Sequence, residues 1–238
     1  MVRRALAATT DEALELIAAG AVRVQGAVAD NGGRLVAAGD AVVVDGPPPR
    51  FVGRGGEKLD FALDAFGVDV RGRRALDVGA STGGFTDCLL QRGAARVVAL
   101  DVGHGQIDAR LRGDPRVQVV ERTHVNDADP DLVGAPFGLI VADVSFISLT
   151  SIAAALFGRL AAPGADVIVL VKPQFEVPRA VASRGKGVVT APADGEASVA
   201  RVQTAFSGLG ATMMGTVTSP LTGAAGNREF LLHAVAGP

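Results

Sequence analysis

In residues 1–46 the spacing of apolar residues changes from that of a helix to that of strands, which is typical of a small α+β module. Apolar side chains recur at helical spacing after Thr10, which we interpret as the N-cap, and Gly20 ends the pattern. Residues 22–26 and 40–46 alternate between apolar and polar side chains, as half-buried strands do. The pattern therefore predicts one helix followed by two strands.

After Pro47–Pro49, which cannot continue a helix or a strand, the pattern becomes one of alternating helices and strands. We predict a linker at 47–57 and a second domain at 58–238. Apolar runs such as 167–171 lack polar alternation, which indicates strands covered on both faces. The fold class that follows is α/β, a doubly wound, mostly parallel sheet. The predicted helices span 59–66, 84–93, 149–161 and 196–208, and the predicted strands span 74–78, 96–102, 117–121, 137–143, 166–171, 212–218 and 229–235.

Length and composition set the broad class. The chain has 238 residues, of which 48% are hydrophobic and 20% charged, so it can bury one sizeable core and is not wholly disordered. Arg159 and Asp166 interrupt the most apolar region, and no apolar stretch approaches the roughly 20 residues of a membrane helix. A single cysteine, Cys88, and the absence of a signal-like start predict a cytoplasmic protein without stable membrane association.

The basic residues are unevenly divided between lysine and arginine. The net charge is −2, so any nucleic acid must meet a local basic patch rather than a strong overall field. Of the 23 basic residues only Lys58, Lys172 and Lys186 are lysines. Where charge alone suffices this sequence uses arginine, so a lysine marks a position that needs a compact amine able to lose its proton.

A glycine-rich turn follows the first strand of the second domain. The segment Asp77–Phe85 leads from strand to helix, where a parallel sheet opens its ligand crevice. It is neither the dinucleotide pattern G-x-G-x-x-G nor a P-loop. Asp101 ends the next strand, where a carboxylate can accept hydrogen bonds from ribose hydroxyls; a structural turn with a solvated Asp101 is the alternative. The candidate cofactor contacts are Asp77, Gly79, Ser81, Gly83, Gly84, Phe85 and Asp101.

The acidic Asp77 favours one cofactor over another. A dinucleotide would present a pyrophosphate to this turn, whereas S-adenosylmethionine presents an ammonium and a sulfonium, which suit a carboxylate better. Asn126, after a later strand, is either a further adenine contact or a turn-forming residue. The turn thus favours methyl transfer.

Four charged residues fall where the sheet is expected to bring strand ends together. Asp143 and Lys172 each end an apolar strand, where an unpaired charge would be costly. Lys58 opens a helix, and Glu229 begins the final strand. We therefore expect these residues to be paired or to do chemistry, two structural ion pairs being the simpler alternative.

The motifs around these residues resemble the TlyA family. They are Arg54–Leu59, Asp77–Phe85, Ala142–Phe146, Lys172–Glu176 and Gly226–Glu229, in the family's order over nearly the whole chain. Members are RNA ribose 2′-O-methyltransferases with a Rossmann-like, FtsJ-like catalytic domain whose last strand is antiparallel, and some are described as hemolysins.

The resemblance implies a catalytic tetrad of Lys58, Asp143, Lys172 and Glu229. A ribose hydroxyl needs a base before it can attack a sulfonium methyl group. We expect Lys172 to be that base, with Lys58 as a nearby like charge that favours the neutral amine. Asp143 and Glu229 are expected to orient the amines and the hydroxyl.

The first module resembles the alpha-L RNA-binding domain, with a shorter opening helix than that domain usually has, so we expect it to be shortened at its N-terminus. Residues 1–58 carry as many acidic as basic side chains, so RNA contacts would depend on patches. The candidate RNA-binding residues are Arg3, Arg4, Arg23, Arg50 and Arg54, and a further basic patch is Arg179, Arg184 and Lys186.

A few residues leave their role open. Phe146 and Phe175 either stack on nucleobases or fill the core, and Cys88 is expected to be core filling. The three histidines have no metal-ligand spacing, so no metal site is predicted. The predicted function is S-adenosylmethionine-dependent 2′-O-methylation of ribosomal RNA. The alternatives are a membrane-active hemolysin, a nicotinamide-dependent reductase and a catalytically silent RNA-binding protein.

Overall fold

The chain forms two compact units, Met1–Arg50 and Phe51–Pro238, in a computed structural model. Phe51 is buried in the core of the second unit, so the division falls inside the segment predicted as a linker. The structure describes residues 1–45, 49–185 and 187–238. Pro47 and Pro48 of the predicted linker, and Lys186 of the predicted basic patch, lie outside the described residues.

The first unit contains the predicted helix and strands, with small differences. Helix α1 (Thr10–Ala18) follows Thr9, whose hydroxyl accepts a hydrogen bond from the Glu12 amide. Thr9 is therefore the N-cap, and the prediction of Thr10 was one residue late. A 3₁₀ helix, η1 (Val2–Arg4), precedes α1, and the three strands are β1 (Val22–Val24), β2 (Ala27–Val28) and β3 (Val42–Val44). They form an antiparallel sheet in the order β2-β1-β3.

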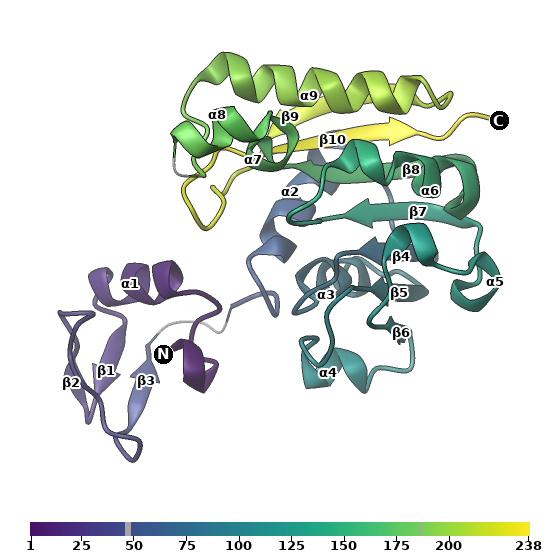
Figure 1. The fold of residues 1–238 in the computed structure, drawn as a ribbon. Helices are drawn as coiled ribbons and strands as arrows, with labels where there is room; N and C mark the ends of the chain where they lie inside the picture. The colour runs from purple at the N-terminus through teal and green to yellow at the C-terminus, as the bar shows by residue number, and fades with distance from the viewer. Residues whose placement is uncertain (46–48, 186) are drawn as a thin grey trace. The chain divides into compact units, whose positions relative to one another are not determined.

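The second unit is built on a seven-stranded sheet in the order β6-β5-β4-β7-β8-β10-β9 (Figure 1). The pairs from β6 to β8 are parallel, and β10 is antiparallel to both of its neighbours. This arrangement confirms the predicted fold class. The strands are β4 (Arg74–Val78), β5 (Arg96–Leu100), β6 (Val117–Val120), β7 (Phe137–Ala142), β8 (Ala161–Val171), β9 (Thr212–Thr218) and β10 (Phe230–Val235).

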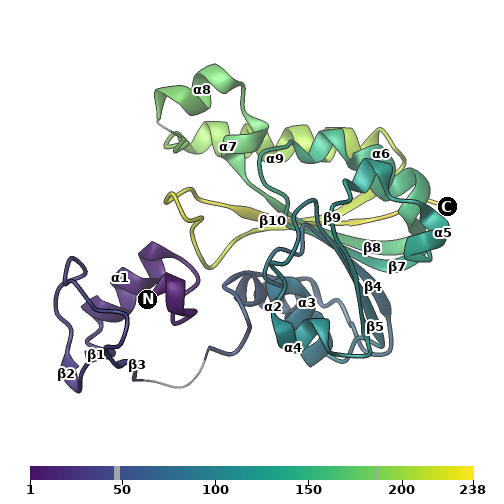
Figure 2. The same ribbon diagram turned by 60° about the horizontal axis from the view of Figure 1, so that its bottom comes forward.

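Helices cover both faces of this sheet, as its apolar strands require. The longer helices are α2 (Gly55–Phe66), α3 (Gly84–Gln91) and α9 (Pro192–Ser207), and the short ones are α4 (Ala109–Arg112), α5 (Pro130–Val133), α6 (Ala153–Ala155), α7 (Pro173–Glu176) and α8 (Arg179–Arg184). Figure 2 shows α9 and α6 on one face and α2 and α3 on the other. Each face of the sheet has its own hydrophobic core. Phe206 of α9 packs into one of these cores, and Leu59 of α2 packs into the other. Among the described helices, none combines the length and apolar character needed to cross a bilayer.

The segment predicted as one helix at 149–161 has a different hydrogen-bonding pattern. A 3₁₀ turn, η3 (Leu149–Ser151), the short α6 and a π-helical turn, η4 (Leu156–Leu160), follow one another, and β8 then begins at Ala161. Apolar spacing reports which side of a helical segment faces the core. It does not distinguish i+3, i+4 and i+5 hydrogen bonds within so short a stretch.

Candidate active site

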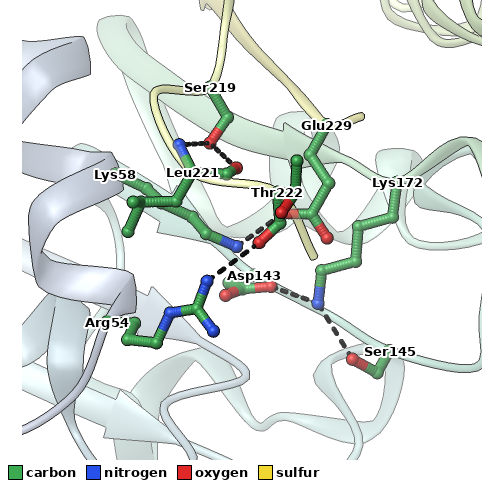
Figure 3. A network of polar contacts seen from close by, with 9 residues as sticks. All are labelled: Arg54, Lys58, Asp143, Ser145, Lys172, Ser219, Leu221, Thr222 and Glu229. Atoms are coloured by element: carbon green, nitrogen blue, oxygen red, sulfur yellow. Dashed lines mark hydrogen bonds and ion pairs between the residues drawn. The ribbon is translucent and has the colours of Figure 1, made fainter. Parts of the chain in front are cut away.

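The strand register brings three of the four predicted catalytic residues to one edge of the sheet. Asp143 follows β7, Lys172 follows β8 and Glu229 precedes β10. Strands β7 and β8 run parallel, so their carboxyl ends meet, and Phe230 of the antiparallel β10 pairs with Val171. This pairing sets Glu229 beside Lys172. Figure 3 shows the resulting network of polar contacts.

Lys58 reaches the same network from helix α2. Its Nζ atom lies 2.5 Å from Oε2 of Glu229. Lys58 is 8% and Glu229 2% exposed, so both charges are nearly out of water. Removing either partner would leave a buried charge without compensation.

Lys172 makes a second, less buried set of contacts. Its Nζ atom lies 2.5 Å from Oδ1 of Asp143 and donates a hydrogen bond of 2.9 Å to Oγ of Ser145. The side chains of Lys172 and Asp143 are 12% and 23% exposed, which leaves this pair open to a substrate. The two lysines thus have carboxylate partners from different elements.

Close packing of glycines places α2 at this edge. A Cβ on Gly84 would stand 3.0 Å from the Gly56 amide nitrogen and 3.1 Å from the Gly53 carbonyl oxygen. The Phe85 ring would lie 3.3 Å from a Cβ on Gly55. Because these positions lack side chains, the start of α2 packs directly on α3 and brings Lys58 to Glu229. Arg54, just before α2, donates a 3.2 Å hydrogen bond to the carbonyl of Thr222 (Figure 3).

A cavity of about 300 Å³ opens beside Asp143, at the carboxyl ends of β4, β5 and β6. Of the predicted cofactor contacts, Gly79, Ser81 and Asp101 line it. Gly79 has φ +82°, and a Cβ there would stand 2.4 Å from the Asp143 carbonyl oxygen. Only glycine permits this close approach of the turn to β7.

Asp101 is held at the wall of the cavity by backbone amides. Its Oδ2 accepts from the Ser81 amide at 2.8 Å, and its Oδ1 accepts from the Gly103 amide at 2.7 Å. Each carboxylate oxygen keeps further acceptor capacity. An oriented carboxylate with free lone pairs can receive hydroxyl donors from a ligand in the cavity.

Other predicted cofactor contacts do not line this cavity. Asp77 is fully buried beneath the turn, where its Oδ2 accepts a 2.6 Å hydrogen bond from Thr86. Burial raises the pKa of the Asp77 carboxyl to about 7, and the nearby Asp143 and Asp101 charges act in the same direction. Asn126 donates instead to the Ser151 carbonyl, 3.1 Å away. Gly83, Gly84 and Phe85 pack against neighbouring elements instead.

The cavity also has lining residues that the sequence analysis missed. Gln106, Thr123 and His124 contribute to its wall, and the Ser81 hydroxyl donates to Oε1 of Gln106 at 3.3 Å. All three follow the carboxyl ends of strands predicted from the sequence, β5 and β6. Their position after those strands was the available signal.

Phe146 and Phe175, beside the tetrad, differ in exposure, since Phe175 is half-buried. Phe146 is 89% exposed, lines the cavity and has a left-handed φ of +69°. Its ring centroid lies 5.4 Å from that of Phe175. Phe146 is therefore not core filling, and it presents an aromatic face to the opening.

The predicted RNA-binding arginines differ in their exposure and in the contacts they make. Arg4 donates to carbonyls of the 37–40 loop, and Arg23 forms an ion pair with Asp45. These contacts lie within the first unit and occupy the guanidinium groups. Arg3 and Arg50 are exposed.

In the parts of the chain that the structure describes, no three His, Cys, Asp or Glu side chains gather as metal ligands would. The charged side chains at this edge include the Lys172–Asp143 and Lys58–Glu229 pairs, Arg54 and Asp101.

This mostly parallel sheet, with β10 reversed and a cavity over its glycine turn, is the fold of the S-adenosylmethionine-dependent methyltransferases. The N-methyltransferase NodS of Bradyrhizobium japonicum shares it with a TM-score of 0.55 and 17% identity, over 78% of this chain and 98% of that one. Residues 51–235 match the FtsJ-like methyltransferase family, and the chain belongs to that family. Family membership confirms the resemblance found in the sequence.

Relatives match over most of the chain. The 16S/23S rRNA (cytidine-2′-O)-methyltransferase TlyA of Mycobacterium tuberculosis is 47% identical over 98% of this chain and 86% of its own length. Hemolysin A of Brachyspira hyodysenteriae is 40% identical over 78% of this chain and 77% of its own. A Streptococcus thermophilus structure named as a candidate hemolysin has a TM-score of 0.82 and 37% identity, over 96% of this chain and 83% of its own.

Proposed function

We propose that this protein transfers a methyl group from S-adenosylmethionine to a ribose 2′-hydroxyl of ribosomal RNA. The observation that carries the proposal is the meeting of two lysine–carboxylate pairs next to a cavity over the glycine turn. The name of the M. tuberculosis relative specifies the same reaction on cytidine, which makes cytidine the first nucleotide to test.

The residues around the cavity fit the proposed cofactor. Asp101 offers an oriented carboxylate for ribose hydroxyls, and its charge suits a free 2′-hydroxyl. Val102, 64% exposed, lines the same cavity with an apolar surface suited to a purine. Gly79 lets the turn pack closely against Asp143 while it lines the cavity. When bound, S-adenosylmethionine supplies an electrophilic methyl group on a sulfonium.

The tetrad supplies the base and orients the nucleophile. Lys172 Nζ, as a neutral amine, takes the proton of the 2′-hydroxyl while the hydroxyl oxygen attacks the methyl group. The Asp143 carboxylate, 2.5 Å from this amine, stabilises the ammonium that the proton transfer creates. In the proposal the buried Lys58–Glu229 pair, held at the same end of the sheet, helps to orient the hydroxyl.

An exposed aromatic side chain at this edge is available to contact the RNA. In the proposal the Phe146 ring, 89% exposed beside the cavity, stacks on a base of the target strand. Arg54, held to the Thr222 carbonyl at the edge of the network, is placed to contact a phosphate. Exposed Arg3 and Arg50 add sequence-independent attraction.

The test uses the purified full chain with separated ribosomal subunits and methyl-labelled S-adenosylmethionine. We expect label in the RNA and a gap at one nucleotide in its alkaline hydrolysis ladder, since a methylated 2′-oxygen cannot attack the phosphate. Label on a base, with an unbroken ladder, would overturn ribose methylation. Dye leakage from liposomes at the same protein concentration, without RNA methylation, would support the hemolysin alternative instead.

A further inference from the structure

Ser145 is the second polar partner of the proposed base. Its hydroxyl oxygen accepts a 2.9 Å hydrogen bond from Lys172 Nζ, the same atom that lies 2.5 Å from Asp143 Oδ1. Ser145 lies two residues after Asp143, on the loop that leaves β7, and lines the cavity. Asp143 and Ser145 therefore face one amine from one short segment (Figure 3).

We propose that Ser145 is a positioning residue that fixes the rotation of the Lys172 amine. A neutral amine has two N–H bonds and one lone pair in tetrahedral directions. If Asp143 and Ser145 accept the two N–H bonds, the lone pair is held in the one remaining direction, where it can receive the substrate proton. With only one acceptor the amine rotates about the Cε–Nζ bond, and its lone pair spends less time directed at the substrate hydroxyl. This inference rests on the proposed function.

The loop that carries Ser145 is anchored to the segment that carries Lys172. Glu176, 3% exposed, accepts from the Ser148 hydroxyl at 2.5 Å and from the Leu149 amide at 2.7 Å. Glu176 lies in α7, which begins directly after Lys172. These bonds tie the end of the β7 loop to α7, so Ser145 and Lys172 are held in a common frame before substrate arrives.

The backbone next to Ser145 is also held in an uncommon conformation. Phe146 has φ +69°, a left-handed conformation that is unfavourable for a residue other than glycine. Such strain persists where the surrounding contacts over-determine the loop. The Glu176 bonds on one side and the Ser145–Lys172 bond on the other are contacts of that kind.

The first test compares Ser145→Ala with Ser145→Thr, which keeps a hydroxyl. We expect Ser145→Ala to lower kcat by about 3- to 10-fold, the usual net effect of one hydrogen bond between neutral groups. The KM for RNA and the Kd for S-adenosylhomocysteine should stay unchanged, and threonine should recover most of kcat. Ser207→Ala, on the exposed surface of α9, is the matched control. Unchanged kcat in Ser145→Ala, a loss confined to KM or Kd, or no recovery with threonine would overturn the proposal.

The second test does not need methyl transfer. The chain has three lysines, so the side-chain nitrogen of Lys172 can be assigned in ¹⁵N spectra with a Lys172→Arg variant. We expect its hydrogen exchange in Ser145→Ala to be at least several-fold faster than in wild type or Ser145→Thr. Equal exchange in all three would contradict the contact itself. Fast exchange in Ser145→Ala together with an inactive wild type would instead refute the proposed function and leave the positioning established.

Discussion

Lys58 Nζ and Glu229 Oε2 lie 2.5 Å apart, although their residues are 171 positions apart in the chain. One comes from the second turn of α2 and the other from the residue before β10. Both are buried, so their charges are balanced chiefly by each other. A pair of this kind is costly to break and much less costly to replace as a whole.

That difference gives a prediction about stability. Lys58→Met and Glu229→Met should each lower the free energy of unfolding by about 3 kcal/mol, because each leaves one buried group without its partner. The double variant Lys58→Met/Glu229→Met should be more stable than either single variant, yet inactive. Urea unfolding followed by circular dichroism measures both effects. Additive losses in the double variant would show that the two side chains do not depend on each other.

The proposed base can be separated from a merely electrostatic lysine. Lys172→Ala should reduce methyl transfer by at least about 10²-fold while retaining affinity for S-adenosylhomocysteine. Lys172→Arg keeps the positive charge next to Asp143, but a guanidinium does not give up its proton, so it should be similarly inactive. Single-turnover methylation measures the rate of methyl transfer, and calorimetry measures the affinity for S-adenosylhomocysteine. Near-normal turnover of the arginine variant would remove Lys172 from the role of base.

Asp101 offers a prediction about cofactor affinity. Asp101→Ala should weaken S-adenosylhomocysteine binding by about 10- to 100-fold, because the ribose hydroxyls lose a charged acceptor. Asp114→Ala is the matched control, since that carboxylate pairs with Arg116 on the surface. Titration calorimetry at constant salt provides the values. Equal affinities in the two variants would place the ribose elsewhere, and tight binding of NAD would revive the reductase alternative.

Asp77 makes stability depend on pH in an unusual direction. Burial raises the pKa of its carboxyl from 3.8 to about 7, so between these values the folded state binds more protons than the unfolded state. The contribution of Asp77 to the free energy of unfolding should therefore fall as pH rises from about 4 to about 7, by at most about 4 kcal/mol.

Asp77→Asn should remove this slope, because the amide does not titrate. Urea unfolding of both proteins at a series of pH values measures it, with Asp114→Asn, at a half-buried carboxylate paired with Arg116, as the control. A variant with the same pH dependence as wild type would show that Asp77 is ionised in the folded protein throughout this range.

Much of the second unit could be predicted from local patterns. Strand β4 has the predicted bounds, and β9 does too, because apolar runs flanked by glycine and polar residues are a property of the sequence itself. Two-residue β2 has too short a pattern to be seen, and the hydrogen bonding of 149–161 is not encoded in apolar spacing. The sequence also indicated the four charged residues, through their positions at strand and helix ends.

The partners of those residues were decided by tertiary structure. The sequence by itself determined which residue types stand at the ends of β7, β8 and β10, since strand ends follow from local apolar pattern. It could not assign Lys58 to Glu229 and Lys172 to Asp143, because that choice depends on the antiparallel register of β10 and on the close packing of α2 against Gly84. The Ser145 contact and the burial of Asp77 were likewise set by the packing of segments distant in the chain, where a side chain's neighbours fix its charge and orientation.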